Sequence, residues 1–203
     1  MINLVALPCL CVDVFDGTDE LRAGGEALNF AVHASKFEEF NVSILGAVGQ
    51  DSYAKFIMDS VSDKRIDVSH VRVEEDKVTA NNRTYLTADG DRYYKDDSWT
   101  GDIVDKMILN QDELDFIKKS EVVFIHFWAG CFEQIEICIT KISTFLILCD
   151  LAVCLATLYV SFSLVFALMR YLQGKVFLIR FYSPTTLSSS RAEFRLPSRL
   201  ACA

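Results

Sequence analysis

Basic residues are in short supply in this chain, where 20 Lys and Arg face 28 Asp and Glu and leave a net charge of −8. A nucleic-acid partner would need a basic face, so this balance argues against that class of function. Glycine is scarce in the last third, where Gly174 alone follows Gly130. A glycine-rich phosphate-binding loop therefore has no place in that part of the chain.

Paired cysteine motifs are also lacking. The seven cysteines sit in apolar runs, and none has the spacing of a zinc site or a redox motif. We therefore expect no metal centre and interpret the cysteines as buried free thiols of a reducing cytoplasm. The opening stretch MINLVALPCLCVDVF has no basic start and contains Asp13, so it predicts a strand rather than a signal peptide.

Hydrophobic residues are plentiful, at 51% of the chain, which is enough for a folded core. Charge is spread unevenly, however. Residues 1–135 hold 13 Lys and Arg against 25 Asp and Glu, whereas residues 136–203 hold 7 against 3. A reversal of net charge of this size at one point indicates two segments of different origin, so we divide the chain at residue 135.

Residues 1–135 alternate apolar strand patterns with helical ones, which predicts an α/β domain with a parallel sheet. The expected strands are 4–14, 41–51 and 122–127, and the expected helices begin at Asn29, Ser52 and Asn110. Asn110 and Glu113 have the spacing of a helix capping box. Asp89 and Gly90 suit the tight turn of a hairpin within residues 78–94.

The stretch AGGEALNFAVHASKF, residues 23–37, carries the most informative motif. Gly24 and Gly25 let the backbone turn sharply or approach a ligand closely. Asn29, at the expected start of the helix, can cap it or offer its amide to a polyol. Helix N-termini also favour oxygen-rich ligands. A glycine turn followed by a capping asparagine is as common without a ligand, so the motif alone leaves both interpretations open.

Several segments occur in the order that they have in the PfkB/ribokinase family of sugar and nucleoside kinases, which the chain resembles from Val5 to about Ile135. These segments are CVD, AGGEALNFA, LGAVGQDSYAKFI, IDVSHV and the hairpin NRTYLTADGDRYY. The spacing from Asp13 to the glycines and the segment HFWAG are most similar to fructoselysine and fructosamine 6-kinases. The resemblance implies a ribokinase-like three-layer α/β fold, present as its N-terminal part, with the hairpin as a lid.

The resemblance also implies roles for single residues. Asp13 would accept hydrogen bonds from sugar hydroxyls, Gly24 and Gly25 would bring the backbone to the sugar, and Asn29 would bind another hydroxyl. Gly49 and Asp51 would hold the turn after the second strand. For Glu26 we favour an interaction with the helix dipole over one with a cationic substrate. The implied partner is a ketosugar or fructosamine, phosphorylated with ATP and Mg²⁺.

The second motif of the family, Asp-Thr-x-Gly-Ala-Gly-Asp, is absent. In relatives it supplies the aspartate that activates the acceptor hydroxyl and the anion hole for the phosphate. We therefore assign no catalytic, cofactor-binding or metal-binding residue and expect a truncated, inactive kinase that binds ATP poorly. The alternative is a non-catalytic sugar-binding remnant, or a membrane-anchored protein that uses its apolar tail. Homo-oligomerisation stays open.

Three explanations compete for the tail, residues 136–203. A frameshift or wrong gene model, which we favour, would explain the charge reversal and the missing motif. A membrane helix at 151–169 would explain a stretch without charged residues, flanked by Arg170, Lys175 and Arg180. A divergent soluble core is the third. The end, 183–203, is rich in Ser and Arg and predicts disorder.

Overall fold

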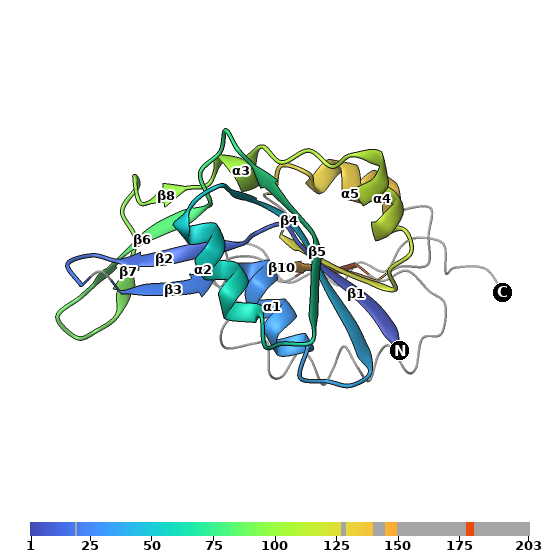
Figure 1. Ribbon diagram of the computed structural model, residues 1–203, viewed down its shortest axis with the longest axis horizontal. Helices are drawn as coiled ribbons and strands as arrows, with labels where there is room; N and C mark the ends of the chain where they lie inside the picture. The colour runs from blue at the N-terminus through green and yellow to red at the C-terminus, as the bar shows by residue number, and fades with distance from the viewer. Residues whose placement is uncertain (19, 127–128, 140–144, 150–177, 181–203) are drawn as a thin grey trace, which may run out of the picture.

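The computed structural model describes residues 1–18, 20–126, 129–139, 145–149 and 178–180. Two sheets organise them, a larger parallel sheet and a smaller one that projects from its side (Figure 1). The larger sheet has six strands in the order β11-β10-β9-β1-β4-β5, and all of its neighbouring strands are parallel. Its strands are β1 (Ile2–Leu7), β4 (Phe40–Gly49), β5 (Ile66–Glu74), β9 (Val122–His126), β10 (Phe145–Cys149) and β11 (Leu178–Arg180).

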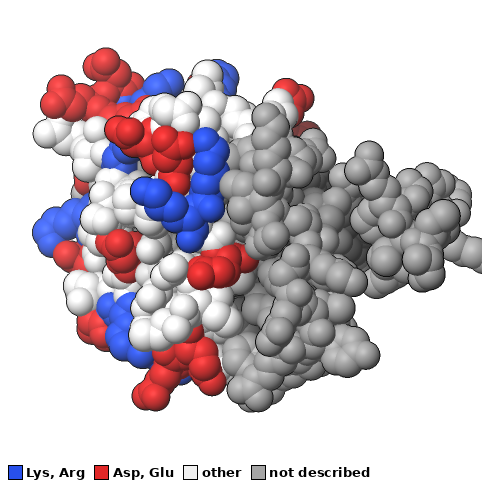
Figure 2. Space-filling model, turned by 90° about the vertical axis from the view of Figure 1, so that its right-hand side faces the viewer, with Lys and Arg blue, Asp and Glu red and all other residues white. Residues whose placement is uncertain are grey.

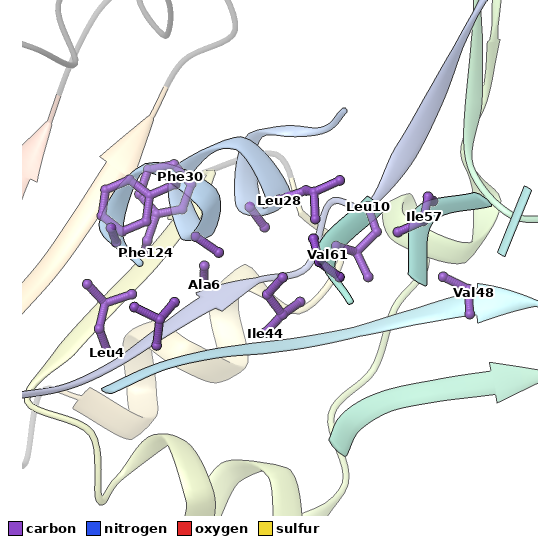
Figure 3. Packing of buried hydrophobic residues seen from close by; sticks show 14 of the residues in the cluster. Leu4, Ala6, Leu10, Leu28, Phe30, Ile44, Val48, Ile57, Val61 and Phe124 are labelled. Carbon is purple, nitrogen blue, oxygen red and sulfur yellow. The ribbon is translucent and has the colours of Figure 1, made fainter. Parts of the chain in front are cut away.

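Helices cover both faces of this sheet, and alternate residues of its strands supply the two cores. The helices are α1 (Glu26–Ala34), α2 (Ser52–Val61), α3 (Asp102–Asp105), α4 (Gln111–Ile117) and α5 (Phe132–Ile139). Leu4 and Ala6 of β1 pack in a first core cluster with α1 and α2 (Figure 3). Val5 and Leu7 face the other way, toward α4 and α5. The period of two along β1 therefore creates a three-layer α/β fold.

The smaller sheet has the strand order β3-β2-β6-β7, with β8 also pairing with β6. Its strands are β2 (Cys11–Phe15), β3 (Leu21–Gly24), β6 (Asn81–Leu86), β7 (Arg92–Tyr93) and β8 (Trp99–Thr100). One strand was expected over residues 4–14, but this prediction is wrong: β1 ends at Leu7, and β2 begins at Cys11 in the other sheet. Pro8 lies at the break, where it has no N–H group to donate to a ladder.

Other predicted elements are confirmed. Helix α2 spans Ser52–Val61 as expected, and β9 lies between two parallel strands. Asn110 and Glu113 form the complete capping box of α4. Strands β6 and β7 pair as an antiparallel hairpin, and Gly90 has a φ of 87° in its turn. Strand β5, by contrast, was not expected from the sequence.

Within residues 136–203, two short strands are described. Strand β10 pairs with β9 and β11 pairs with β10, so both extend the larger sheet. The boundary at residue 135 stays a prediction. The apolar stretch 151–169 and the end 183–203 lie outside the described residues. Among the helices that the structure does describe, none is long and apolar enough to cross a membrane.

Charged side chains of both signs are mixed on the described part of the surface shown in Figure 2. Several of them form exposed ion pairs, such as Lys55 with Asp59 and Lys106 with Asp102, each one helical turn apart. Exposed pairs of this kind contribute little to stability. The stability of the domain therefore depends mainly on its buried apolar clusters.

We expect the substitution Phe124→Leu to lower the free energy of unfolding by about 1–2 kcal/mol. The rings of Phe124 in β9 and Phe30 in α1 are stacked, with centroids 4.0 Å apart, and both side chains are buried. The matched control is Phe37→Leu, because Phe37 is 42% exposed and should change stability by less than about 0.5 kcal/mol. Urea unfolding measures both variants, and equal losses would show that the stacked pair has no special role.

Candidate functional site

Asp13 lies in the middle of β2, at the junction of the two sheets. Val12 and Val14, its neighbours in the strand, pack in or against the first core cluster, so the side chain of Asp13 faces the other way. That side chain is 19% exposed. Burial raises the pKa of Asp13, while the guanidinium groups of Arg92 and Arg22 act in the opposite direction. Asp13 was expected to close a strand of the parallel sheet and instead lies within a strand of the smaller one.

Gly24 lies beside this carboxylate. It ends β3 and is the cross-strand partner of Cys11. A Cβ atom added to Gly24 would lie 3.7 Å from the Oδ2 atom of Asp13. The structure thus brings together two residues that the sequence places eleven positions apart, and no side chain on Gly24 covers the carboxylate.

Gly25 has a different role, because its backbone approaches the chain itself. Its φ is 98°, which favours glycine, and an added Cβ atom would overlap the carbonyl oxygen of Cys9. The same Cβ atom would lie 2.9 Å from the carbonyl carbon of Cys9. Gly25 is also the N-cap of α1, and the N–H group of Leu28 donates to the Cys9 carbonyl. The local fold therefore requires glycine at position 25 whether or not a ligand is present.

Helix α1 begins at Glu26, so the prediction that it begins at Asn29 is wrong, and of the two roles open to Asn29 the structure excludes that of N-cap. Asn29 lies exposed within the first half of the helix. Its backbone N–H group donates to the carbonyl of Gly25, as expected inside a helix. A contact between the Asn29 amide and a ligand stays a prediction.

Arg92 of the hairpin reaches the Asp13 carboxylate. Its Nη1 atom lies 3.5 Å from Oδ2 of Asp13, and its guanidinium carbon is 5.2 Å from the ring centroid of Phe15. Arg22 of β3 lies over the same ring at 4.7 Å. Burial and the nearby Asp13 carboxylate raise the pKa of Tyr94, which follows β7 in the hairpin. The hairpin thus contributes a cation and a phenol to the surroundings of Asp13.

A second polar group lies buried behind Gly25. Glu26, in the first turn of α1, is 9% exposed, and its Oε2 atom is 3.9 Å from Nδ1 of the fully buried His126. Burial raises the pKa of Glu26. Burial also lowers the pKa of His126 to about 3. A hydrogen bond with Cys11, followed by burial and the Glu26 charge, raises the pKa of the Cys9 thiol. All three groups are buried.

Gly49 and Asp51 are architectural, as predicted. Asp51 caps α2, where its carboxylate accepts hydrogen bonds from the N–H group of Ala54 at 2.9 Å and from both donors of Thr79 at 2.8 and 2.7 Å. The N–H group of Gly49 donates to the Thr79 hydroxyl at 2.9 Å. An added Cβ atom on Gly49 would overlap the Lys77 carbonyl oxygen, so the turn has no room for a side chain.

Sequence reasoning missed the contribution of β6. Asn82 is the parallel cross-strand partner of Asp13, and Thr84 is that of Phe15. Registered partners in a sheet point to the same face, so Asn82 and Thr84 lie on the face of Asp13. The alternation within NNRTYL could have shown which residues of β6 share a face. Only the pairing of β6 with β2 shows which face that is.

Two observations on the described residues concern the phosphate and metal sites of a kinase. The described glycine nearest the tail, Gly130, packs against the backbone of Asp105, so it offers no open cradle for phosphate. Within the same part of the chain, no group of three or more His, Cys, Asp or Glu side chains is arranged to hold a metal ion.

The architecture matches that of ribokinase-like proteins among solved structures. Arabidopsis thaliana ribokinase, solved with ribose and ATP, aligns with a TM-score of 0.57 and 18% identity over 72% of this chain and 52% of that one. Halothermothrix orenii fructokinase aligns with a TM-score of 0.58 and 13% identity over 72% of this chain and 56% of that one. At these identities the likeness concerns the fold. A three-layer fold of this class is therefore established for the described residues.

The sequence comparisons then identify the family. The profile of the pfkB family carbohydrate kinases matches residues 14–123, more than half of the chain, and the chain belongs to this family. It is 25% identical over 128 residues to the fructoselysine 6-kinases of Escherichia coli (strain K12) and Shigella flexneri. The match covers 63% of this chain and 47% of each relative, so the chain spans about half the length of these curated relatives.

We expect Gly25→Ala to lower the free energy of unfolding by about 3 kcal/mol, because alanine disfavours the positive φ and its methyl group meets the Cys9 carbonyl. Gly90→Ala is the matched control. Gly90 also has a positive φ, but an added Cβ atom has nothing within 4 Å, so we expect a loss of about 1–2 kcal/mol. Equal losses in urea unfolding would contradict the close approach of Gly25 to Cys9.

Acid should destabilise the protein through His126. In the unfolded chain a histidine binds a proton near pH 6.5, whereas His126 in the folded protein stays neutral down to about pH 3. The unfolded state therefore binds more protons in this window. As the pH is lowered through it, the free energy of unfolding decreases by up to about 1.4 kcal/mol per pH unit. Glu26 acts in the opposite direction just above pH 4.5, because its raised pKa favours proton binding by the folded state.

Urea unfolding between pH 7.5 and pH 4, on the parent chain and on His126→Leu, measures this effect. The variant should lose most of the slope between pH 6.5 and pH 5. His33→Asn is the comparison. Burial and the nearby Lys36 also lower the pKa of His33, but this side chain is exposed, so its variant should lose a smaller part of the slope than His126→Leu. An unchanged slope in His126→Leu would show that another group causes the acid sensitivity.

Proposed function

We propose that this chain provides the sugar-binding part of an ATP-dependent carbohydrate kinase, and that the sugar lies against Asp13, Gly24 and Gly25. The observation that carries this proposal is the juxtaposition of Asp13 and Gly24. An ionised carboxylate can accept hydrogen bonds from two neighbouring hydroxyl groups, and the missing side chain of Gly24 leaves room for a ligand beside it. Arg92 and Tyr94 place the hairpin next to the same carboxylate.

We propose a ketosugar or a fructosamine as the substrate class. The 25% identity to fructoselysine 6-kinases over 128 residues supports it, although that match spans 47% of those proteins. Asn29 stays a candidate for a further hydroxyl contact, because it is exposed on α1 four residues beyond Gly25. A cytoplasmic location accords with this substrate class and stays a prediction.

We further propose that this chain binds the sugar without phosphorylating it. Residues 136–203 contain three carboxylates, Glu136, Asp150 and Glu193, and none belongs to the second family motif. The relatives of the family use ATP, which supplies the transferred phosphoryl group when bound. On this proposal, Asp13 and the glycines orient the sugar, and the residue that removes the proton from its hydroxyl is not part of this chain.

Calorimetric titration of the purified full chain with D-fructose tests the sugar site. We expect Asp13→Asn to weaken binding by about 10- to 150-fold, because a hydrogen bond to a charged acceptor contributes about 1.5–3 kcal/mol. Asp16→Asn is the matched control. Asp16 lies just beyond the same strand but is 42% exposed and pairs with Arg83 at 2.7 Å, so this variant should bind as the parent does.

Two results would contradict the proposal. Equal affinity of the parent and the Asp13→Asn variant would remove the sugar site from this face. Phosphorylated sugar in a reaction of the chain with ATP, Mg²⁺ and D-fructose would contradict the expected lack of turnover, provided that Asp13→Asn abolishes the product.

A further inference from the structure

The face of the smaller sheet that carries Asp13 contains an unusual polar atom on β6. Asn82 is the direct partner of Asp13 in the parallel register of β2 and β6, and on its other side it is the partner of Trp99 in β8. Adjacent strands lie about 4.8 Å apart, so the side chains of Asn82 and Asp13 are neighbours on one face. Neither residue is fully exposed.

The side-chain oxygen Oδ1 of Asn82 is shielded from solvent and has no hydrogen-bond partner among the described residues. A buried acceptor without a partner costs about 1–3 kcal/mol, so such atoms are rare in folded proteins. The neighbouring Asn81 provides a contrast within the same strand. Its side chain points to the opposite face, where Nδ2 donates to the carbonyl of Thr79 at 3.0 Å.

The unpartnered oxygen of Asn82 and the carboxylate of Asp13 are both acceptors. Two adjacent acceptors do not satisfy each other. Arg92 provides a cation to Asp13, whereas the described residues provide no donor to Oδ1 of Asn82. A ligand with neighbouring hydroxyl groups provides several donors at once. Because the amide oxygen is buried, it discriminates between ligands: a ligand without a donor at the matching position leaves this oxygen unpaired.

We propose that Asn82 determines the specificity of the sugar site, and that its side-chain oxygen accepts a hydrogen bond from a ligand hydroxyl next to those bound by Asp13. This inference rests on the proposed sugar-binding function and adds a residue to the site. It predicts opposite effects of an apolar replacement. Stability without sugar rises because the unpaired acceptor is gone, whereas sugar affinity falls because a hydrogen bond is lost.

The experiment compares the parent chain, Asn82→Leu and the control Asn81→Leu in two measurements. Without sugar, the midpoint temperature of thermal unfolding should rise by about 2–4 °C in Asn82→Leu. It should fall by a similar amount in Asn81→Leu, which loses its hydrogen bond to Thr79. Titration with D-fructose should show about 10-fold weaker binding by Asn82→Leu, and the parent affinity in Asn81→Leu. Asn82→Val, with a side chain suited to a strand, is a second apolar variant should the leucine not fold.

A series of epimers identifies the hydroxyl. D-Psicose differs from D-fructose only at carbon 3, and D-tagatose differs from it only at carbon 4. The parent should bind one of them more weakly than D-fructose, and Asn82→Leu should bind that epimer and D-fructose within about twofold of each other, because the discriminating contact is gone.

The outcomes separate this inference from the proposed function. If Asp13→Asn no longer binds D-fructose and both Asn82 variants keep the parent affinity, the proposed sugar site is supported and the role of Asn82 is refuted. If the Asn82 variants lose affinity and thermal stability together, Asn82 is a structural residue and the inference is again refuted. If the parent chain binds neither these three sugars nor fructoselysine, the proposed function and this inference both fail.

Discussion

The close approach between the backbones of Gly25 and Cys9 is the constraint on which the rest of the site depends. Because Gly25 has no side chain, the start of α1 lies against the segment that links the two sheets, and Leu28 donates to the carbonyl of Cys9. The preceding residue, Gly24, is thereby fixed beside Asp13. A single backbone contact thus sets the position of α1 on the larger sheet and the position of the end of β3 in the smaller sheet.

Titratable groups of two kinds lie near this junction, and, after burial, the charge of Asp13 contributes to the raised pKa of Glu26. Behind it, Glu26 and His126 are excluded from solvent, and burial favours the neutral form of each. In front of it, Asp13 keeps partial contact with solvent and has Arg92 as an ionic neighbour. Buried neutral groups add polarity to the core without attracting ligands, whereas a partly exposed carboxylate beside a glycine can take up donors from a ligand. The front of the junction is therefore the candidate site, although both sides contain titratable groups.

Much of the fold could be predicted because its signals are local. The capping box of Asn110, the tight turn at Gly90 and the apolar run of β9 depend on a few neighbouring residues. The start of α1 was misplaced because Asn29 suits a cap, while the contact of Gly25 with Cys9 is not local and could not be inferred from the sequence. The role of Asn82 depends on the register between β2 and β6, which are separated by more than sixty residues.

Amide chemical shifts of ¹⁵N-labelled chain, recorded during a titration with D-fructose, test the central claim most directly, because each amide reports on its own surroundings. If a sugar binds at the junction, saturable shifts should concentrate in β2, in β3 with Gly24 and Gly25, and in the β6–β7 hairpin. The amide shifts of helix α4 and strand β5, which contribute no residue to the junction, should stay unchanged. An absence of shifts, or shifts centred on α4 and β5, would contradict a sugar site at Asp13.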